Sequence, residues 1–313
     1  MQKKVTLIVP CYNEQGTLHQ FYGAVKEVIN HLAEYDWEIL FVNDGSKDAT
    51  LTVIKDLRKA DQRVSYVDLS RNFGKENAML AGFDFATGDC AILLDADLQD
   101  PPSLIPKMIA LWEKGYQDVY ARRKDRGCES WLRRKLSMAY YSLLQRTTRI
   151  DILENVGDFR LLDRKCIDAL CQLREKERYT KGMFCWIGYR KKDIEFNRGD
   201  RAAGVSSFNF LKLFELAIEG ITSFTTAPLR LSTFLGISIS FVTLLYVLYF
   251  LTKTILFGDP VRGFPTLVII ILFLGGIQLL SLGIIGEYLG RIFHETKNRP
   301  VYLVNEYSGT QTE

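Results

Sequence analysis

Three aspartates follow a short apolar run about a third of the way along the chain. Residues 91–94 read Ala-Ile-Leu-Leu, which predicts a buried strand, and Asp95, Asp97 and Asp100 come directly after it. Because alternate residues of an extended chain point to the same side, Asp95 and Asp97 should face one space. Two like charges so placed repel each other unless a cation lies between them. Oxygen ligands of this kind suit Mg²⁺ or Mn²⁺, and Gln99 can add a carbonyl oxygen.

We therefore predict a metal site formed by Asp95, Asp97 and Gln99. A divalent ion held by only two or three protein oxygens keeps open positions, which fit the phosphates of a nucleotide. The alternative is an acidic strand exit in which Pro101 and Pro102 start a helix. A lone D-x-D pattern favours that alternative, and the rest of the chain reverses the preference.

Apolar runs alternate with helical patterns through the first part of the chain, which predicts a mostly parallel α/β sheet. The predicted strands are residues 5–9, 38–42, 64–69, 91–94 and 118–121, with further strand-like runs at 157–162 and 192–196. The predicted helices are residues 17–34, 49–60, 77–86 and 102–114. Polar loops follow the strands at residues 10–14, 43–48, 71–75 and 95–100. Because ligands bind beyond the carboxyl ends of such strands, we expect these loops to form one site.

Two long apolar stretches change the composition near residue 229. Residues 231–252 and 263–286 hold 22 and 24 residues without a formal charge, and a ten-residue connector joins them. At ~1.5 Å rise per residue the first is roughly 33 Å long, about the thickness of a bilayer's hydrocarbon core. We expect a transmembrane helical hairpin and reject two buried helices of a soluble protein. Basic residues beside the outer ends place both termini in the cytoplasm.

The predicted organisation has four parts. They are a cytoplasmic globular domain at 1–205, an amphipathic helix beside the membrane at 206–228, the hairpin at 229–292 and a cytoplasmic tail at 293–313. Residues 130–147 and 207–224 have helical patterns that fit either packing on the sheet or lying in the membrane interface.

Bulk composition excludes several other classes of protein. The 313-residue chain has a formal net charge of +3, so we expect no nucleic-acid partner. The six cysteines contain no C-x-x-C pair, which indicates reduced thiols and no disulfide framework. The N-terminal apolar run is too short for a signal peptide, which agrees with a cytoplasmic N-terminal domain.

The order of three polar segments resembles the inverting, GT-A-fold glycosyltransferases of family 2. These segments are V-P-C-Y-N-E (9–14), N-D-G-S-K-D-A-T (43–50) and D-A-D-L-Q-D-P-P (95–102). Five more are similar to the polyisoprenyl-phosphate glycosyltransferases, above all to the bacterial bactoprenol glucosyltransferases and more distantly to dolichol-phosphate mannose synthase. They are S-R-N-F-G-K-E (70–76), E-N-V-G-D-F-R-L (154–161), E-G-I-T-S-F (219–224), F-L-G-G-I-Q (273–278) and G-E-Y-L-G-R (286–291).

This resemblance implies a GT-A, Rossmann-like, mostly parallel sheet with interfacial helices and the two-helix transmembrane hairpin. It implies inverting transfer of a hexose, with glucose from UDP-glucose as the leading donor, to undecaprenyl phosphate. The lipid-linked sugar would serve modification of a cell-surface glycan such as lipopolysaccharide. The expected setting is the bacterial inner (plasma) membrane, crossed more than once, with a homo-oligomer, Mg²⁺ or Mn²⁺, a nucleotide sugar and the lipid bilayer as partners.

Three alternatives stay open at this point. The sugar can be N-acetylglucosamine or mannose, because these motifs do not define the sugar pocket. The chain can be a catalytically weak membrane scaffold that keeps the fold. A processive polysaccharide synthase would share the nucleotide loops, but it usually needs a Q-x-x-R-W segment and more membrane helices, and this chain has neither.

The resemblance also assigns residues to the parts of the site. The donor-binding residues are Pro10, Tyr12, Asn13, Glu14, Asp44, Lys75, Asp95 and Ala96. The residues that bind the acceptor phosphate are Arg123, Arg134, Arg201 and Ser206. Asp97, as a metal ligand, and Asp158, as the base or the group that orients a cation, are the catalytic residues. One departure is Ser207, which stands where the family usually has lysine.

Each of the assigned polar residues also has an ordinary structural explanation. Asp44 can cap the helix that begins near residue 49, although Ser46 or Asp48 fits that position better. Lys75 can be an exposed lysine at a helix start, and Asp158 can simply pair with Arg160.

Overall fold

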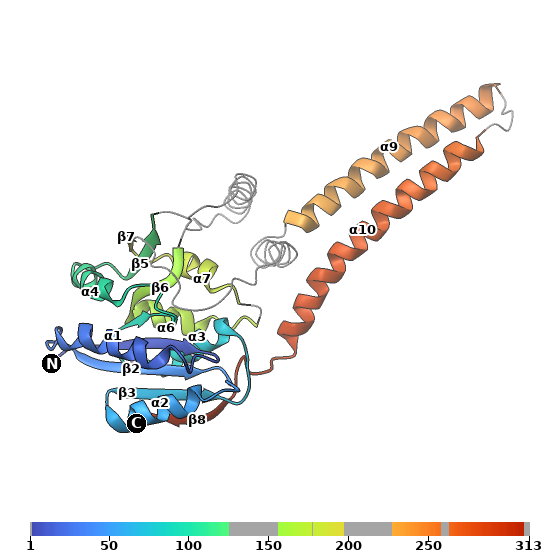
Figure 1. Cartoon of the computed structure of the whole chain (residues 1–313). Helices are drawn as coiled ribbons and strands as arrows, with labels where there is room; N and C mark the ends of the chain where they lie inside the picture. The colour runs from blue at the N-terminus through green and yellow to red at the C-terminus, as the bar shows by residue number, and fades with distance from the viewer. Residues whose placement is uncertain (1, 125–155, 177, 197–226, 258–262, 310–313) are drawn as a thin grey trace. The chain divides into compact units, whose positions relative to one another are not determined.

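A computed structural model describes residues 2–124, 156–176, 178–196, 227–257 and 263–309. The chain divides into two compact units, which are Met1–Phe210 together with Arg299–Glu313, and Leu211–Asn298. Figure 1 shows the first unit as an α/β sheet with helices on its faces and the second as two long helices. The expected residues Arg134, Arg201, Ser206 and Ser207, and the helical patterns at 130–147 and 207–224, lie outside the described residues.

One eight-stranded sheet forms the centre of the first unit, in the order β7-β5-β6-β4-β1-β2-β3-β8. Its strands are β1 (Lys4–Cys11), β2 (Asp36–Asn43), β3 (Val64–Leu69), β4 (Cys90–Leu93), β5 (Asp118–Arg123), β6 (Val156–Asp163), β7 (Lys191–Phe196) and β8 (Val304–Ser308). Neighbours β4, β1, β2 and β3 are parallel, whereas β6 is antiparallel to β4 and β5, and β8 is antiparallel to β3. The predicted mostly parallel α/β sheet is confirmed.

The helices of the first unit are α1 (Leu18–Asn30), α2 (Thr50–Ala60), α3 (Lys75–Phe85), α4 (Ile105–Glu113), α6 (Arg164–Gln172) and α7 (Thr180–Trp186). A short 3-10 turn, η1 (Pro102–Leu104), precedes α4. The first four helices confirm the predicted ones, while α6 and α7 were not predicted. Asp163 marks the start of α6, because its side chain accepts a hydrogen bond from the backbone N–H of Lys165 at 3.1 Å.

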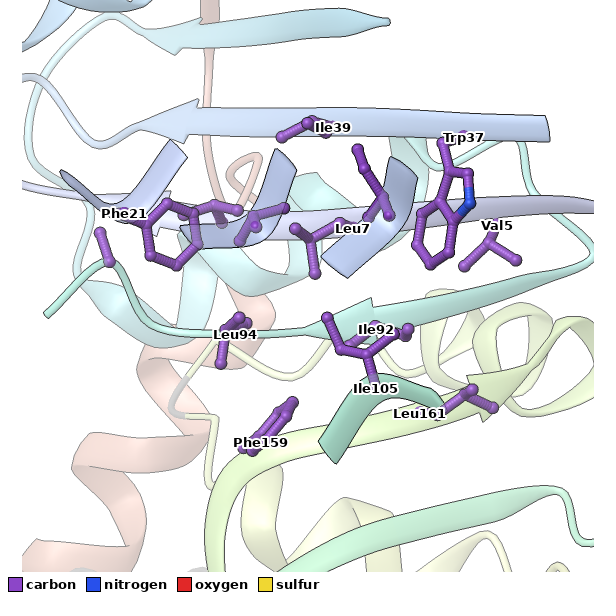
Figure 2. Close-up of a cluster of buried hydrophobic side chains, with 14 of the residues drawn as sticks. Val5, Leu7, Phe21, Trp37, Ile39, Ile92, Leu94, Ile105, Phe159 and Leu161 are labelled. Atoms are coloured by element: carbon purple, nitrogen blue, oxygen red, sulfur yellow. The ribbon is translucent and has the colours of Figure 1, made fainter. Parts of the chain in front are cut away.

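Both faces of the central strands β1, β2, β3 and β4 are buried, which explains why these strands are largely continuous apolar runs rather than alternating ones. Along β1 and β2, Leu7 and Ile39 belong to one buried cluster, whereas Ile8 and Leu40 belong to another. Figure 2 shows the first cluster, in which Phe21 and Ile105 of two helices face side chains of the strands. Because buried clusters pack on both faces of the sheet, the ends of its strands are held in fixed positions.

The second unit consists of α9 (Ala227–Phe257) and α10 (Phe264–Thr296), so both expected apolar stretches are helical. In their described parts they expose large apolar side chains, among them Phe234, Ile237, Phe241, Leu279 and Leu282. One described stretch, Phe273–Thr296, is long and apolar enough to cross a membrane. The structure therefore does not confirm a second crossing, and the predicted multi-pass hairpin remains a prediction for α9.

The sequence predicts only a tail after α10, but the chain beyond this helix belongs to the sheet unit. β8 forms one edge of the sheet and pairs antiparallel with β3, from Tyr66 opposite Ser308 to Leu69 opposite Val304. The backbone N–H of Ser70 also donates to the carbonyl of Leu303 at 2.9 Å. The segment after the helical pair is thus part of the sheet.

Candidate active site

The expected polar loops meet at the carboxyl edge of β4, β1, β2 and β3. These four strands are adjacent and parallel, so the loops that follow them leave the sheet on the same side. Side-chain contacts join the loops in pairs: Asn13 with Ser46, Asp44 with Phe73, and Lys75 with Asp95. The predicted convergence of the four loops is therefore confirmed.

The loop after β1 is held against the loop after β2. The backbone N–H of Asn13 donates to Ser46 Oγ at 3.0 Å, and the N–H of Lys47 donates to Asn13 Oδ1 at 2.9 Å. Asn13 has a φ of 57°, a left-handed conformation that asparagine tolerates better than most residues. Pro10, the last but one residue of β1, is partly buried, and Tyr12, the first residue after the strand, is 42% exposed. Asn13 therefore determines the shape of the loop, and Tyr12 in the same loop is exposed and accessible to a ligand.

Asp44 fastens the loop after β3 to the loop after β2. Its two carboxylate oxygens accept the backbone N–H groups of Phe73 at 2.7 Å and Gly74 at 3.0 Å. Gly45 has a φ of +61°, and a Cβ there would lie 2.3 Å from the carbonyl carbon of Arg71, so the two loops are in backbone contact. Burial raises the pKa of Asp44, and the two backbone donors lower it in part.

Neither Asp44 nor the alternatives Ser46 and Asp48 occupies the N-cap position of α2, which is Ala49, but Asp48 bonds to the first residue of the helix. Asp48 Oδ1 accepts the backbone N–H of Thr50 at 3.0 Å. The remaining lone pairs of Asp44 leave it able to accept a hydrogen bond from a ligand, since each carboxylate oxygen has two.

Lys75 lies between two carboxylates from different strands. Its Nζ is 2.7 Å from Asp95 Oδ2, which follows β4, and 2.6 Å from Asp158 Oδ2, which belongs to β6. Burial raises the pKa of Asp95 and the ammonium of Lys75 offsets part of that effect. Burial alone would also raise the pKa of Asp158, but the charges of Lys75 and Lys181 outweigh it, so this pKa is lowered. Asp158 therefore stays ionised at neutral pH.

Asp158 contacts Lys75 and does not form the structural ion pair with Arg160 that was the alternative explanation. Arg160, the alternative partner, instead pairs with the buried Asp118 at 3.2 Å and lies 3.6 Å from the centre of the Phe184 ring. Its guanidinium is therefore engaged in the core. Asp158 faces Lys75 and, through it, the loop of Asp95.

Asp97 and Gln99 lie in the turn that follows Asp95. Asp97 Oδ1 accepts the backbone N–H of Gln99 at 3.1 Å, and Leu98 between them has a φ of 57°. Gln99 Oε1 is buried without a hydrogen-bond partner among the described residues. Burial raises the pKa of Glu14, with smaller contributions from the charges of Asp97 and Asp95. Negative charge therefore accumulates around this turn.

These oxygens fit a hard divalent cation, which binds carboxylate and amide oxygens. Two carboxylates and an amide oxygen without a partner form the predicted ligand set of Asp95, Asp97 and Gln99. Within the described ranges, no three His, Cys, Asp or Glu side chains are grouped as a metal site. A metal at this turn thus stays a prediction.

Arg123 lies beside the start of β6, at the end of β5. Its Nη2 is 3.7 Å from Asp100 Oδ1, and its Nε is buried without a hydrogen-bond partner in the described structure. A Cβ on Gly157 would lie 3.3 Å from Arg123 Nη2, so the guanidinium packs against the residue before Asp158. Ala96, the last of the predicted donor residues, is buried in the turn after Asp95.

The start of α7 borders the site and was not predicted. The backbone N–H of Thr180 donates to Glu76 Oε2 at 3.0 Å, which ties α7 to the first turn of α3. Lys181, the next residue, lowers the pKa of Asp158 by its charge. Residues 176–182 read K-E-R-Y-T-K-G and have no periodic pattern of apolar residues. The high density of charged residues is the one sequence feature that could have indicated a place in the site.

Comparisons with known proteins show the family of the chain. Residues 6–171 match the model of the family described as glycosyl transferase family 2. The chain is 44% identical to an uncharacterized glycosyltransferase of Synechocystis, covering 99% of this chain and 98% of that one. It is 45% identical to the bactoprenol glucosyl transferase of Shigella phage SfX, covering 96% of this chain and 98% of that one. A prophage bactoprenol glucosyl transferase homolog of Escherichia coli is 44% identical over 96% of this chain and 98% of its own length.

The family match covers the strands and loops that carry Asp44, Lys75, Asp95 and Asp158, and the relatives match over nearly their whole lengths. The chain is a GT-A glycosyltransferase and belongs to glycosyl transferase family 2.

Proposed function

We propose that the protein transfers glucose from UDP-glucose to undecaprenyl phosphate, with inversion at the anomeric carbon. The observation that carries the proposal is the placement of Asp95, Lys75 and Asp158 within 2.7 Å contacts at the edge where four loops meet. The names of the Shigella phage and Escherichia coli relatives support both glucose as the sugar and bactoprenol as the acceptor.

In the proposed reaction an oxygen of the lipid phosphate forms a bond to C1 of glucose as the bond from C1 to the diphosphate breaks. UDP leaves with the electron pair of that bond, and the α-linked donor gives a β-linked product. The acceptor oxygen needs little help in losing a proton, because the second pKa of such a phosphate is about 6. Positioning and charge compensation are therefore the main tasks of the site.

Asp158 performs these tasks beside the acceptor, and Lys75, as a donor-binding residue, faces the phosphates of the nucleotide. The lowered pKa of Asp158 keeps it anionic, which favours the orientation of a cation toward the acceptor phosphate over the uptake of a residual proton. Lys75 can exchange one carboxylate contact for a phosphate oxygen. Arg123, with Arg134, Arg201 and Ser206 outside the described residues, would supply the remaining phosphate contacts.

On the donor side, Pro10, Tyr12, Asn13, Glu14 and Asp44 would surround the nucleoside. Asp95, Asp97 and Gln99 would hold Mg²⁺ or Mn²⁺, whose positive charge stabilises the leaving diphosphate. Their carboxylate and amide oxygens are the ligands these ions prefer.

Membrane attachment follows from the second unit in this proposal. Large apolar side chains exposed on α9 and α10 need an apolar environment, and a bilayer supplies one. We propose that both helices cross the inner membrane as a hairpin, with the sheet unit on the cytoplasmic side.

A transfer assay on the purified full-length protein tests this proposal. With undecaprenyl phosphate, Mn²⁺ or Mg²⁺ and radiolabelled UDP-glucose, the wild type should move label into the organic phase. Asp158→Asn and Asp97→Ala should each lower the rate by about 10²- to 10⁴-fold. Asp56→Asn is the matched control, because it neutralises an exposed carboxylate that pairs with Lys59 on α2, and it should keep the wild-type rate.

Parallel arms with UDP-N-acetylglucosamine and GDP-mannose identify the sugar. Label transferred only from one of these donors would replace glucose but retain the reaction. Donor binding without any transfer would support the scaffold alternative, and an Asp97→Ala variant as active as the wild type would rule out the proposed metal site.

A further inference from the structure

The strand β8 reaches the site from the far end of the chain. Its pairing with β3 contains a bulge, because Asp68 lies opposite Glu306 whereas the next residue, Leu69, lies opposite Val304. Asn305 is the residue left without a partner in the register. Bulges often redirect a side chain next to a functional site, so the contacts of Asn305 are informative.

The side chain of Asn305 is bonded to the end of β3. Its Nδ2 donates to Asp68 Oδ2 at 2.8 Å. The other oxygen of the same carboxylate, Asp68 Oδ1, accepts from Asn43 Nδ2 at 2.7 Å. Asp68 and Asn43 are buried, with 5% and 2% of their surface exposed, so water competes little for the hydrogen bond between them, whereas the bond from the exposed Asn305 is only partly buried. The carboxylate of Asp68 therefore links β8, β3 and β2. We call the hydrogen-bonded residues Asn305, Asp68 and Asn43 the row.

The row continues into the loops that hold the nucleoside in the proposed function. Asn43 directly precedes Asp44, and its Oδ1 accepts the backbone N–H of Ser46 at 3.4 Å. Ser46 Oγ in turn accepts the N–H of Asn13 at 3.0 Å. Hydrogen bonds thus connect Asn305 to Asn13 through Asp68, Asn43 and Ser46, and the chain connects Asn43 directly to Asp44.

We infer that Asn305 is a positioning residue for the nucleoside end of the donor site, acting through Asp68 and Asn43. The inference rests on the proposed nucleotide-sugar donor. It gives the segment that follows α10 a part in donor binding, although this segment lies 237 positions beyond Asp68 in the sequence.

The neighbouring residue Glu306 provides a matched control. Its carboxylate also anchors β8, by contacts with Lys55 Nζ at 2.5 Å and with Tyr66 OH at 2.7 Å. Those partners lie on α2 and in β3, and the contacts do not continue into the loops. Glu306→Ala therefore weakens the attachment of β8 without cutting the row through Asp68.

The experiment measures UDP binding and turnover for purified full-length variants. Asn305→Ala should raise the Kd for UDP and the KM for UDP-glucose about fivefold, and leave kcat and the KM for undecaprenyl phosphate close to wild type. Glu306→Ala should leave the Kd for UDP unchanged. Thermal unfolding of both variants shows whether each has lost a comparable part of its stability.

Reversing the hydrogen bond gives an independent test. Asn305→Asp alone places two carboxylates together and should weaken UDP binding. Adding Asp68→Asn restores a donor and acceptor at both contacts, because the new amide can donate to residue 305 and accept from Asn43. The double variant should regain most of the wild-type affinity for UDP.

Wild-type affinity in Asn305→Ala, or equal losses in Asn305→Ala and Glu306→Ala, would overturn the inference. A double variant that binds UDP no better than Asn305→Asp would do the same. A wild-type protein that fails to bind UDP would overturn the proposed nucleotide donor as well, whereas the preceding outcomes leave that donor in place.

Discussion

Lys75 is the residue on which the charge balance of the site depends. Its ammonium contacts both Asp95 and Asp158, two carboxylates that would otherwise repel each other in a half-buried place. Burial acts to lower the pKa of Lys75, but the two carboxylates outweigh it and raise this pKa. Lys75 therefore stays charged as the pH rises through the ordinary lysine range, and its contribution to stability is lost only above that range.

Replacing Lys75 by methionine should destabilise the protein in a pH-dependent manner. At pH 7.5 both carboxylates are ionised and face each other, so the thermal midpoint should fall below that of the wild type. At pH 5 the difference should be smaller, because burial raises the pKa of Asp95 and the loss of the Lys75 ammonium raises it further, so uptake of a proton relieves the repulsion as the pH falls. Thermal unfolding of variant and wild type at both pH values measures the two differences.

Lys59→Met is the control for this prediction. Lys59 is an exposed lysine paired with Asp56 on α2, and such pairs contribute little to stability. Its midpoint should match the wild type at both pH values. Equal losses at pH 7.5 and pH 5 in Lys75→Met would show that repulsion between Asp95 and Asp158 is not the cause.

At the scale of elements, the packing of α3 determines the position of Lys75. The helix begins at Lys75 and lies close against β1 and β2. Gly82 permits this approach, because a Cβ there would lie 2.3 Å from Ile8 Cγ2 and 3.5 Å from Val42 Cγ2. The small residue in the middle of the helix thus affects the position of the lysine at its start.

Gly82→Ala should lower the free energy of unfolding by about 1–3 kcal/mol, as expected for overpacking a core. The cost should be smaller in an Ile8→Ala background, where the colliding methyl group is absent. Urea unfolding followed by tryptophan fluorescence measures both values. Gly23→Ala is the matched control on α1, because nothing lies within 4 Å of its Cβ, and it should be neutral or stabilising. A neutral Gly82→Ala would contradict the close packing of α3.

At the scale of the whole molecule, the chain leaves the sheet unit, forms α9 and α10, and then returns to complete the sheet. The sheet unit comprises Met1–Phe210 and Arg299–Glu313, so it is discontinuous in sequence. Besides its pairing with β3, the returning segment bonds to α3 through Tyr302 OH, which donates to Asp84 Oδ2 at 2.5 Å. Residues 302–308 are therefore part of the folded sheet unit.

Ending the chain after Arg299 should destabilise the sheet unit, because β3 becomes an exposed edge and Asp84 and Asp68 each lose a hydrogen bond. We expect the thermal midpoint to fall by roughly 4–8 °C, the shift that a loss of about 2 kcal/mol causes in a unit of this size. Ending the chain after Gly309 retains β8 and is the control. Equal midpoints for the two truncations would show that β8 adds nothing to the stability of this unit.

Much of the fold could be predicted from local sequence. Strands such as 38–42 and helices such as 49–60 are visible in the periodicity of apolar residues, and the order of the loops identified the family. The helices α6 and α7 were missed because they are short and because their neighbours in sequence gave no clear boundary. β8 was missed because an edge strand with Asn305 and Glu306 exposed has no apolar pattern.

The sequence by itself determined the alternation of strands and helices, the acidic turn after β4 and the family, because each depends on residue types and short spacings. Only the tertiary structure decided that Lys75 contacts Asp95 and Asp158, which lie 20 and 83 positions away, and that Asn305 contacts Asp68. The physical reason is that periodicity reports which side of an element is buried, while the partner of a polar side chain depends on which distant strands lie side by side.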